Sequence, residues 1–317
     1  MRAYIIRRLI AVPLMLLAMS FFLFILLFIR PGNAALAVSG GFNEAGARSE
    51  EFERSLGLDR PWYIQYLDWL GDAVRGDLGQ ALKPPRHSVT GQIKDRIGNT
   101  AEIGLLTIAL SAIIGLTVGV LSAAKRNSSV DYILRLVTIV GISVPSFWTA
   151  TLLVTLPAKY WQVTPGLASN YYTLWDNPIE NLKIVIWPAM ILSVSSAAYI
   201  ARIVRSSMLE TLYSDHVRTA RMKGLAERVV ILRHVLRTSL IAVVTVLGLQ
   251  LGTVLGGAVI AEQIFAIPGM GLLTYEAVFA EDYTLVLGTM MVFAAMFLLI
   301  TLLVDISYTF IDPRIRY

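Results

Sequence analysis

The chain has 317 residues, of which 56% are hydrophobic and 15% charged, and its mean hydropathy is +0.65. An average soluble domain is about 45–50% apolar and about 25% charged, and one globular core of this size leaves much of the chain in water. The composition excludes a disordered, fibrous or nucleic-acid-binding chain, because these classes are rich in charge. Since the chain has no cysteine, it has no disulfides, thiolate nucleophile or thiolate zinc site. We therefore predict an integral membrane protein.

Six apolar runs are long enough to cross a bilayer as helices, which takes about 20 residues. They cover residues 9–29, 101–124, 136–158, 184–201 (continuing with more polar residues towards 209), 240–261 and 285–310. Pro145 and Pro157 predict kinks in the third run. The expected fold class is all-α, with six transmembrane helices.

The first run, 9–29, also resembles a signal peptide, since it follows basic residues and precedes Ala35-Leu36-Ala37, a possible cleavage site. Its apolar stretch of 21 residues is longer than the 7–15 typical of a signal sequence. The length favours a retained membrane helix.

Lysine and arginine are distributed unevenly between the loops, and the richer side is normally cytoplasmic. With a cytoplasmic N-terminus, the inner segments carry 16 of the 27 basic residues and 6 of the 22 acids. The outer segments then carry 11 basic residues and 16 acids. The sequence therefore predicts that both termini are cytoplasmic.

Two connecting segments are too long to be simple turns. Residues 30–100 form a 71-residue outer loop with an aromatic-rich stretch from Trp62 to Trp69. We expect this loop to fold as a short amphipathic helical cap, with a flexible loop as the alternative.

The inner loop, 202–237, is predicted to fold as a helix, a glycine turn and a second helix. Ser214 or Asp215 caps the first helix, which ends near Lys223 and Gly224. The second short helix carries apolar positions that are expected to be exposed, at Val229, Ile231, Leu232, Val235 and Leu236.

Catalytic signatures are missing from the sequence. It contains no Gly-x-x-x-x-Gly-Lys-Ser/Thr phosphate loop and no His-Glu-x-x-His metal helix. Glu102, Glu262 and Asp305 lie near the ends of spans, which argues against a proton relay or intramembrane proteolysis. The hydroxyls around Ser193 and Ser195–Ser196 fit helix packing better than a nucleophile. We predict no catalytic residue and no metal site.

Small residues recur every four positions in two of the runs, which places them on one helix face. These are Gly248, Gly252 and Gly256 in the fifth run, and Ser111, Gly115 and Gly119 in the second. Small side chains let two backbones approach closely. The pattern fits packing within the chain, and it equally fits a dimer seam or a moving surface beside a pathway.

The inner loop resembles the EAA loop of binding-protein-dependent ABC importer permeases, specifically their dipeptide/oligopeptide/nickel branch. The resemblance rests on Arg218-Thr219-Ala220-x-x-x-Gly224. Other segments similar to that branch cover most of the chain in order: Tyr4-Ile5-Ile6-Arg7-Arg8-Leu9, Arg30-Pro31-Gly32, Leu56-Gly57-Leu58-Asp59-Arg60-Pro61, Gly76-Asp77-Leu78-Gly79, Val144-Pro145-Ser146-Phe147-Trp148, Glu262-Gln263-Ile264-Phe265-x-Ile267-Pro268-Gly269-Met270-Gly271 and Asp312-Pro313-Arg314-Ile315-Arg316.

The chain departs from the family pattern at three places. Arg218-Thr219-Ala220 replaces Glu-Ala-Ala, His234-Val235-Leu236-Arg237 replaces Ile-x-Leu-Pro, and Pro31-Gly32-Asn33 replaces Pro-Gly-Asp. The first two variations resemble those of the peptide branch and leave docking intact.

The resemblance implies a type I importer permease of the bacterial or archaeal inner membrane, one half of a channel for peptides. Its implied partners are a second homologous permease, two cytoplasmic ATPase subunits that hold ATP and Mg, and an extracytoplasmic solute-binding protein. This chain itself would hold no cofactor and would not be an enzyme. The implied ATPase-coupling residues are Asp215, Arg218, Thr219, Ala220, Lys223, Gly224 and Leu225. Alternatives are a nickel, oligosaccharide or opine permease of the same branch, or a membrane scaffold without transport.

The expected organisation has three parts. Residues 1–98 hold the first helix and the outer loop, 99–310 form the permease core with the EAA loop at about 210–237, and 311–317 are a cytoplasmic tail.

Overall fold

The computed structural model describes residues 2–28, 60–83, 85–167 and 170–311. Within these ranges the chain is helical, with one isolated antiparallel bridge between Gln80 and Ser88. The helices are α1 (Arg2–Phe28), α4 (Trp62–Val74), α5 (Val89–Ala124), α6 (Ser129–Ser143), α7 (Ser146–Trp161), α8 (Pro178–Thr211), α9 (Asp215–Met222), α10 (Glu227–Val229), the π-helical segment η1 (Val230–Val235), α11 (Leu236–Phe265), α12 (Met270–Phe279) and α13 (Tyr283–Ile311).

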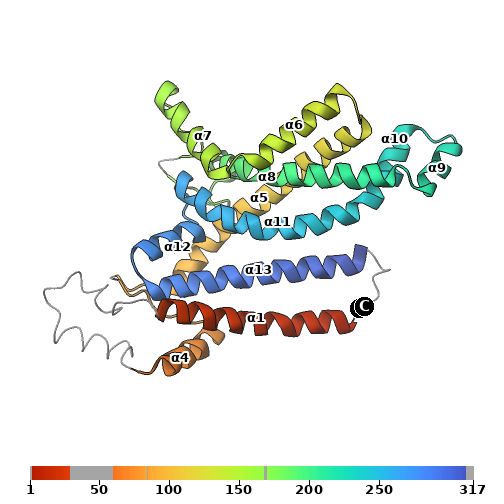
Figure 1. Ribbon diagram of the computed structural model, residues 1–317. Helices are drawn as coiled ribbons and strands as arrows, with labels where there is room; N and C mark the ends of the chain where they lie inside the picture. Colours follow the sequence, from red (N-terminus) through yellow and green to blue (C-terminus); the bar gives the residue numbers. More distant parts are fainter. Residues whose placement is uncertain (1, 29–59, 84, 168–169, 312–317) are drawn as a thin grey trace.

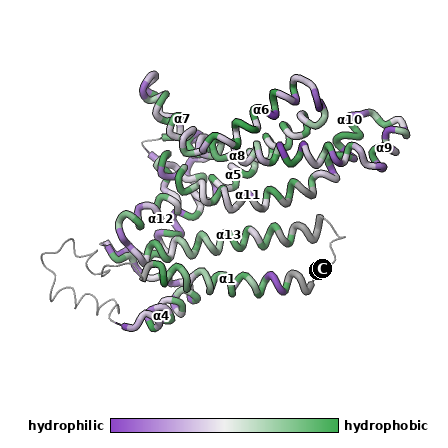
Figure 2. The backbone as a smooth tube through the Cα atoms, in the orientation of Figure 1, coloured by the Kyte–Doolittle hydropathy of each residue, from purple (hydrophilic) through white to green (hydrophobic). Residues whose placement is uncertain are grey.

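The long helices run side by side, and the connecting elements gather at the two ends of the bundle (Figure 1). The start of α1 and the end of α13 lie at the same end as α9 and α10, whereas α4 and α12 lie at the opposite end. Figure 2 shows hydrophobic residues along the long helices and hydrophilic residues towards their ends. Helices of this kind suit a bilayer because each satisfies its own backbone hydrogen bonds.

Among the described residues, five helices are long and apolar enough to cross a membrane, and a sixth span exists if α6 and α7 are taken together. The kink predicted at Pro145 is present as a break of 92° between α6 and α7, which is sharper than a kink within one continuous helix. Pro145 causes this break, since it forces Val144 into an extended conformation (φ −84°, ψ 122°). Pro157, by contrast, lies inside α7 without ending it.

The outer connection also differs from the expected loop of 71 residues. The helical cap is present as α4, but α5 begins at Val89, twelve residues before the predicted start of the second span. Ser88 sets this start, because its hydroxyl accepts a hydrogen bond from the Gly91 backbone N–H at 3.3 Å.

Several of the motifs that resemble the family lie outside the described residues. These are the motifs at 30–32 and 312–316, part of the motif at 56–61, and Asn33.

Helix α8 packs closely on α5, and two glycines of α5 make the approach possible. A Cβ atom on Gly115 would lie 2.8 Å from the Ala197 carbonyl oxygen of α8, and one on Gly119 would lie 2.8 Å from that of Ala201. Backbone atoms cannot move aside as a flexible side chain can. These glycines therefore act in packing within the chain.

The glycines of α11 are divided between two environments. Gly248 faces Val304 and Gly252 faces Phe297, both on α13. Gly256 is exposed, and nothing lies within 4 Å of the position a Cβ would take. The four-residue repeat thus continues from a packed contact into a free surface.

We predict that Gly119→Ala lowers the free energy of unfolding by about 1–3 kcal/mol, because the added methyl group meets the α8 backbone. Gly104→Ala is the matched control, since Gly104 is buried in the same helix and has open space around a Cβ. Thermal unfolding of the purified protein in detergent measures both. Equal unfolding temperatures for the two variants would contradict the packing argument.

Candidate functional site

The sequence-predicted coupling segment folds as helix α9 followed by a turn. Ser214 occupies the position before α9 and its hydroxyl donates to the Thr211 carbonyl oxygen at 2.6 Å, so it does not cap α9 through its side chain. Lys223 ends α9, and Gly224 follows with a φ of +75°. In this left-handed region glycine is free of the penalty of about 1–2 kcal/mol that a Cβ incurs. Nothing lies within 4 Å of a Gly224 Cβ position, so the backbone conformation is what requires glycine.

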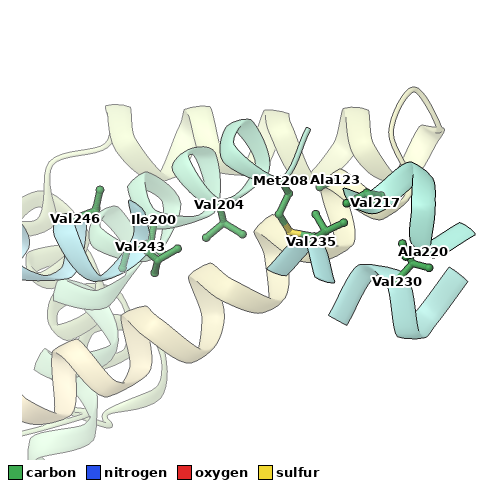
Figure 3. Close-up of a cluster of buried hydrophobic side chains, with 10 residues drawn as sticks. All are labelled: Ala123, Ile200, Val204, Met208, Val217, Ala220, Val230, Val235, Val243 and Val246. Carbon is green, nitrogen blue, oxygen red and sulfur yellow. The ribbon is translucent and has the colours of Figure 1, made fainter. Parts of the chain in front are cut away.

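One face of α9 is buried against the rest of the protein. Val217 and Ala220 are buried and pack in a cluster with Met208 of α8 and with Val230 and Val235 of η1 (Figure 3). The same cluster reaches Ala123 at the end of α5 and Val243 and Val246 of α11. The inner face of α9 is therefore packed on η1, and the shared cluster links it to α5, α8 and α11.

The second half of the inner loop also differs from the expectation. The predicted separate short helix is a continuous run of α10, η1 and α11, because the chain passes from one to the next without a turn. Val235 is buried, although it was expected to be exposed, since it faces the α9 cluster. Ile231 and Leu236 are partly buried against the same cluster, whereas Val229 and Leu232 are exposed, as expected.

The opposite face of α9 and the turn are open to solvent. Of the seven residues implied by the family resemblance, six are exposed: Asp215, Arg218, Thr219, Lys223, Gly224 and Leu225. Ala220 is the exception, because it packs inward. Met222, which sequence reasoning did not single out, is 85% exposed beside them. The exposed surface thus combines the apolar side chain of Met222 with the cationic side chains of Arg218 and Lys223.

An ion pair closes the turn at Gly224. Arg221 of α9 donates from Nε to one oxygen of Glu227 at 3.1 Å and from a terminal nitrogen to the other at 2.7 Å. Both side chains are substantially exposed, so the pair contributes little stability. Hydrogen bonding from Arg221 lowers the pKa of Glu227. The pair is therefore formed at neutral pH and is lost as the pH falls through that lowered pKa.

A buried ion pair binds α6 to α8 near the same end of the bundle. Asp131, at the start of α6, is fully buried and accepts hydrogen bonds from Arg205 Nε and Nη2 on α8, both at 2.9 Å. It also accepts from the Ser122 hydroxyl at 2.6 Å and the Asn127 N–H at 3.0 Å. Arg135 lies 3.8 Å from the same carboxylate. Such a bidentate, fully hydrogen-bonded arrangement holds two helices in one relative position.

The turn between α5 and α6 also contacts the connection that leads into α9. The Arg126 guanidinium lies over the Tyr213 ring, 5.2 Å from its centroid. Tyr213 stands directly before Ser214, at the entrance to α9. In the sequence, Asp131, Arg126 and Arg205 stand out only as charges of the inner segments. Spacing gives no signal for the ion pair, since its partners are 74 residues apart.

At the opposite end of the bundle, a buried carboxylate fixes the start of α12. Glu262 lies near the end of α11, as expected, and is fully buried. It accepts hydrogen bonds from the Thr100 hydroxyl at 2.6 Å and the Leu272 N–H at 3.0 Å. Thr100 in turn accepts from the Met270 N–H at 2.8 Å. A Cβ on Gly271 would lie 2.5 Å from the Val259 Cα, which explains glycine there. The Glu262-to-Gly271 motif therefore joins α5, α11 and α12.

No group of three or more metal-ligating acids or histidines occurs among the described residues. Ser193 donates to the Met190 carbonyl oxygen at 2.7 Å within its own helix, which agrees with the packing interpretation of that hydroxyl. What the described part of the chain offers is an exposed helix face and turn at one end of a helical bundle.

The fold is that of the membrane subunits of ABC importers. The chain superposes on the MetNI methionine ABC transporter in an inward-facing conformation with a TM-score of 0.58 at 16% identity, covering 70% of this chain and 96% of that one. It also superposes on an amino acid ABC transporter crystallised with histidines, with a TM-score of 0.53 at 13% identity, covering 71% and 95% of the two chains.

The chain belongs to the family of binding-protein-dependent transport system inner membrane components, whose model matches residues 115–317. The N-terminal model of the same family matches residues 1–97. A putative peptide permease protein of Brucella suis biovar 1 is 40% identical over 319 residues, covering 100% of this chain and 99% of its own. The dipeptide transport system permease protein DppB of Escherichia coli K12 is 35% identical over 338 residues, covering 100% and 99%. The protein is thus a transport subunit of the inner membrane and not an enzyme.

Removing one partner of the buried pair tests its contribution to the fold. Arg205→Met leaves the Asp131 charge buried beside only Arg135, and we expect a loss of about 3–5 kcal/mol in stability. Arg202→Met is the matched control, since Arg202 lies on the same helix, is exposed, and stacks over the Tyr199 ring at 5.1 Å from its centroid. Thermal unfolding in detergent measures both.

The double variant Asp131→Asn with Arg205→Met removes both charges, and we expect it to recover much of the loss. If Arg202→Met and Arg205→Met unfold at the same temperature, the ion pair does not hold α6 to α8.

Proposed function

We propose that this chain forms half of the membrane pathway of a peptide importer and that α9, with the turn at Gly224, docks in a cleft of a cytoplasmic ATPase subunit. The observation that carries the proposal is the two-sided character of α9. Its inner face is packed through Val217 and Ala220 into a core shared with η1 and the ends of the long helices, whereas its outer face presents Met222, Arg218 and Lys223 to solvent. A helix that is rigidly seated and apolar at its exposed tip suits docking to a soluble partner.

The contacts around α9 support a route by which ATPase movement reaches the membrane. A displacement of α9 acts directly on Met208 of α8 and Val235 of η1, because these side chains share one core. The Asp131–Arg205 pair then carries movement of α8 to α6, and hence to the bend before α7. Alternating access requires two arrangements of such linked helices that are close in energy.

The exposed face of α11 supports the inference that this helix lines the solute pathway. Thr253, Gly256, Ile260 and Gln263 are exposed on one side of this helix, at positions that recur at helical spacing, so the face carries one hydroxyl and one amide beside an apolar side chain. Polar side chains at membrane depth are unfavourable against lipid and normally face a partner or a watery passage. We place the pathway, shared with a second homologous permease, along this face.

The complex that we infer contains this chain, the second permease, two ATPase subunits that bind ATP and Mg, and an extracytoplasmic binding protein. Peptides are the inferred cargo, because the relatives at 40% and 35% identity are a putative peptide permease and a dipeptide permease. The distribution of basic residues supports cytoplasmic termini and a cytoplasmic α9.

The proposed coupling between α9 and the ATPase is tested by changing the turn at Gly224. Gly224→Asp adds a side chain at positive φ and a carboxylate beside Lys223. We expect this variant to reach the membrane normally but to lose both co-purification of the ATPase subunits and peptide uptake. Gly98→Asp is the control, because Gly98 is an exposed glycine at the far end of α5 with open space around a Cβ.

Uptake and ATPase recovery at the wild-type level in Gly224→Asp would contradict docking at this turn. A complex that hydrolyses ATP in response to loaded binding protein, yet moves no peptide, would instead indicate a scaffold or another cargo.

Topology is tested by labelling, since the native chain has no cysteine. Met222→Cys and Trp175→Cys place thiols at residues that are 85% and 91% exposed, in α9 and between α7 and α8. In sealed cells, a membrane-impermeant maleimide is expected to label the thiol at 175 and to spare the thiol at 222. Labelling of both from outside, or of 222 alone, would contradict the orientation.

A further inference from the structure

Helix α4 lies beside the membrane span of α1 and not above it. The Tyr66 hydroxyl is 2.9 Å from the Ser20 hydroxyl of α1, and both residues are buried. Ser20 lies six residues before Leu26, where the apolar window of α1 ends. At 1.5 Å per residue this is about 9 Å inside the span. Ring contacts of Tyr66 with Phe21 and Phe24, at 5.5 and 5.4 Å between centroids, hold α4 at the same depth.

The apolar surface of α4 is wider than the part that α1 covers. One stripe at helical spacing, Trp62, Tyr66, Trp69 and Ala73, includes the residues that contact α1. A second stripe adjoins it, formed by Tyr63, Leu67, Leu70 and Val74. Tyr63, Leu67 and Val74 are 51%, 61% and 81% exposed. A soluble helix would place polar residues at these positions.

The charged residues of α4 are confined to the opposite side. Asp68 and Asp72 share that side and are paired with Arg60 at 3.1 Å and Arg75 at 3.6 Å. Figure 1 shows α4 on the side of α1 that faces away from α13, at the edge of the bundle and far from α11. An edge position at membrane depth, with an uncovered apolar stripe and a separate charged side, is the arrangement of a helix in the membrane interface.

We propose that α4 lies in the outer interface of the bilayer, with the Tyr63–Leu67–Val74 stripe inserted at the boundary between headgroups and acyl chains and the Asp68–Asp72 side facing water. The occupant of the exposed stripe is therefore lipid. Through the Tyr66–Ser20 contact, α4 fixes the depth of the outer end of α1 in the membrane. This role depends on α1 crossing the bilayer and is independent of the cargo and of ATPase docking.

The test measures the depth of two single cysteines in the assembled transporter, reconstituted in nanodiscs of phosphatidylethanolamine and phosphatidylglycerol with partner subunits that lack reactive cysteine. Leu67→Cys probes the apolar stripe and Asp72→Cys the charged side, and each carries a nitroxide spin label. Collision with oxygen, which concentrates in the bilayer, is compared with collision with a water-soluble nickel chelate. We expect the oxygen-to-nickel accessibility ratio to be several-fold higher at position 67 than at 72.

A high nickel accessibility at position 67, equal to that at 72, would overturn the proposal and place α4 in water. Low accessibility of position 67 to both reagents would also overturn it, because the stripe would then be covered by protein, either the binding protein, the second permease or another part of this chain. Val74→Cys lies on the same stripe and repeats the measurement if Leu67→Cys does not assemble.

Discussion

Helix α8 is the element against which the others are positioned, and its position depends on direct backbone contact with α5. Gly115 and Gly119 allow that contact, which no larger residue fits without moving a carbonyl group of α8. Gly141 of α6 packs against Ala198 of the same helix, and a Cβ on Gly141 would lie 3.2 Å from the Ala198 Cβ. In a bilayer the hydrophobic effect does not drive helices together, so close packing of small residues supplies much of the attraction between them.

The two ends of the bundle are fixed by different chemistry. At the end that carries α9, an apolar core and the buried Asp131–Arg205 pair join α5, α6, α8, α9 and α11 into one unit. At the other end, Glu262 and Thr100 attach α12 to α5 and α11 through hydrogen bonds to backbone N–H groups. The buried carboxylates at both ends must keep their hydrogen-bond and ion-pair partners, because a buried charge that loses its partner strongly destabilises the fold.

Two parts of the molecule remain less constrained by this framework. After the bend of 92°, α7 packs on the bundle through Ala150 but exposes Phe147, Trp148 and Trp161. The exposed side of α11 continues the glycine repeat beyond its contacts with α13, at Gly256. Surfaces of this kind are where a helical bundle has room to meet lipid or a second subunit, whereas its core has none.

The sequence by itself determined the helical class, the number of apolar segments and the turn at Gly224, because hydropathy, length and the glycine requirement at positive φ are local properties. It also predicted the helical cap at α4. Only the tertiary structure decided that α9 is seated through Val217 and Ala220 and that α6 turns sharply into α7. It alone paired Asp131 with Arg205, 74 residues away, and Glu262 with Thr100, 162 residues away. Such pairings depend on which helix faces meet, and the spacing of residues along one chain does not encode that choice.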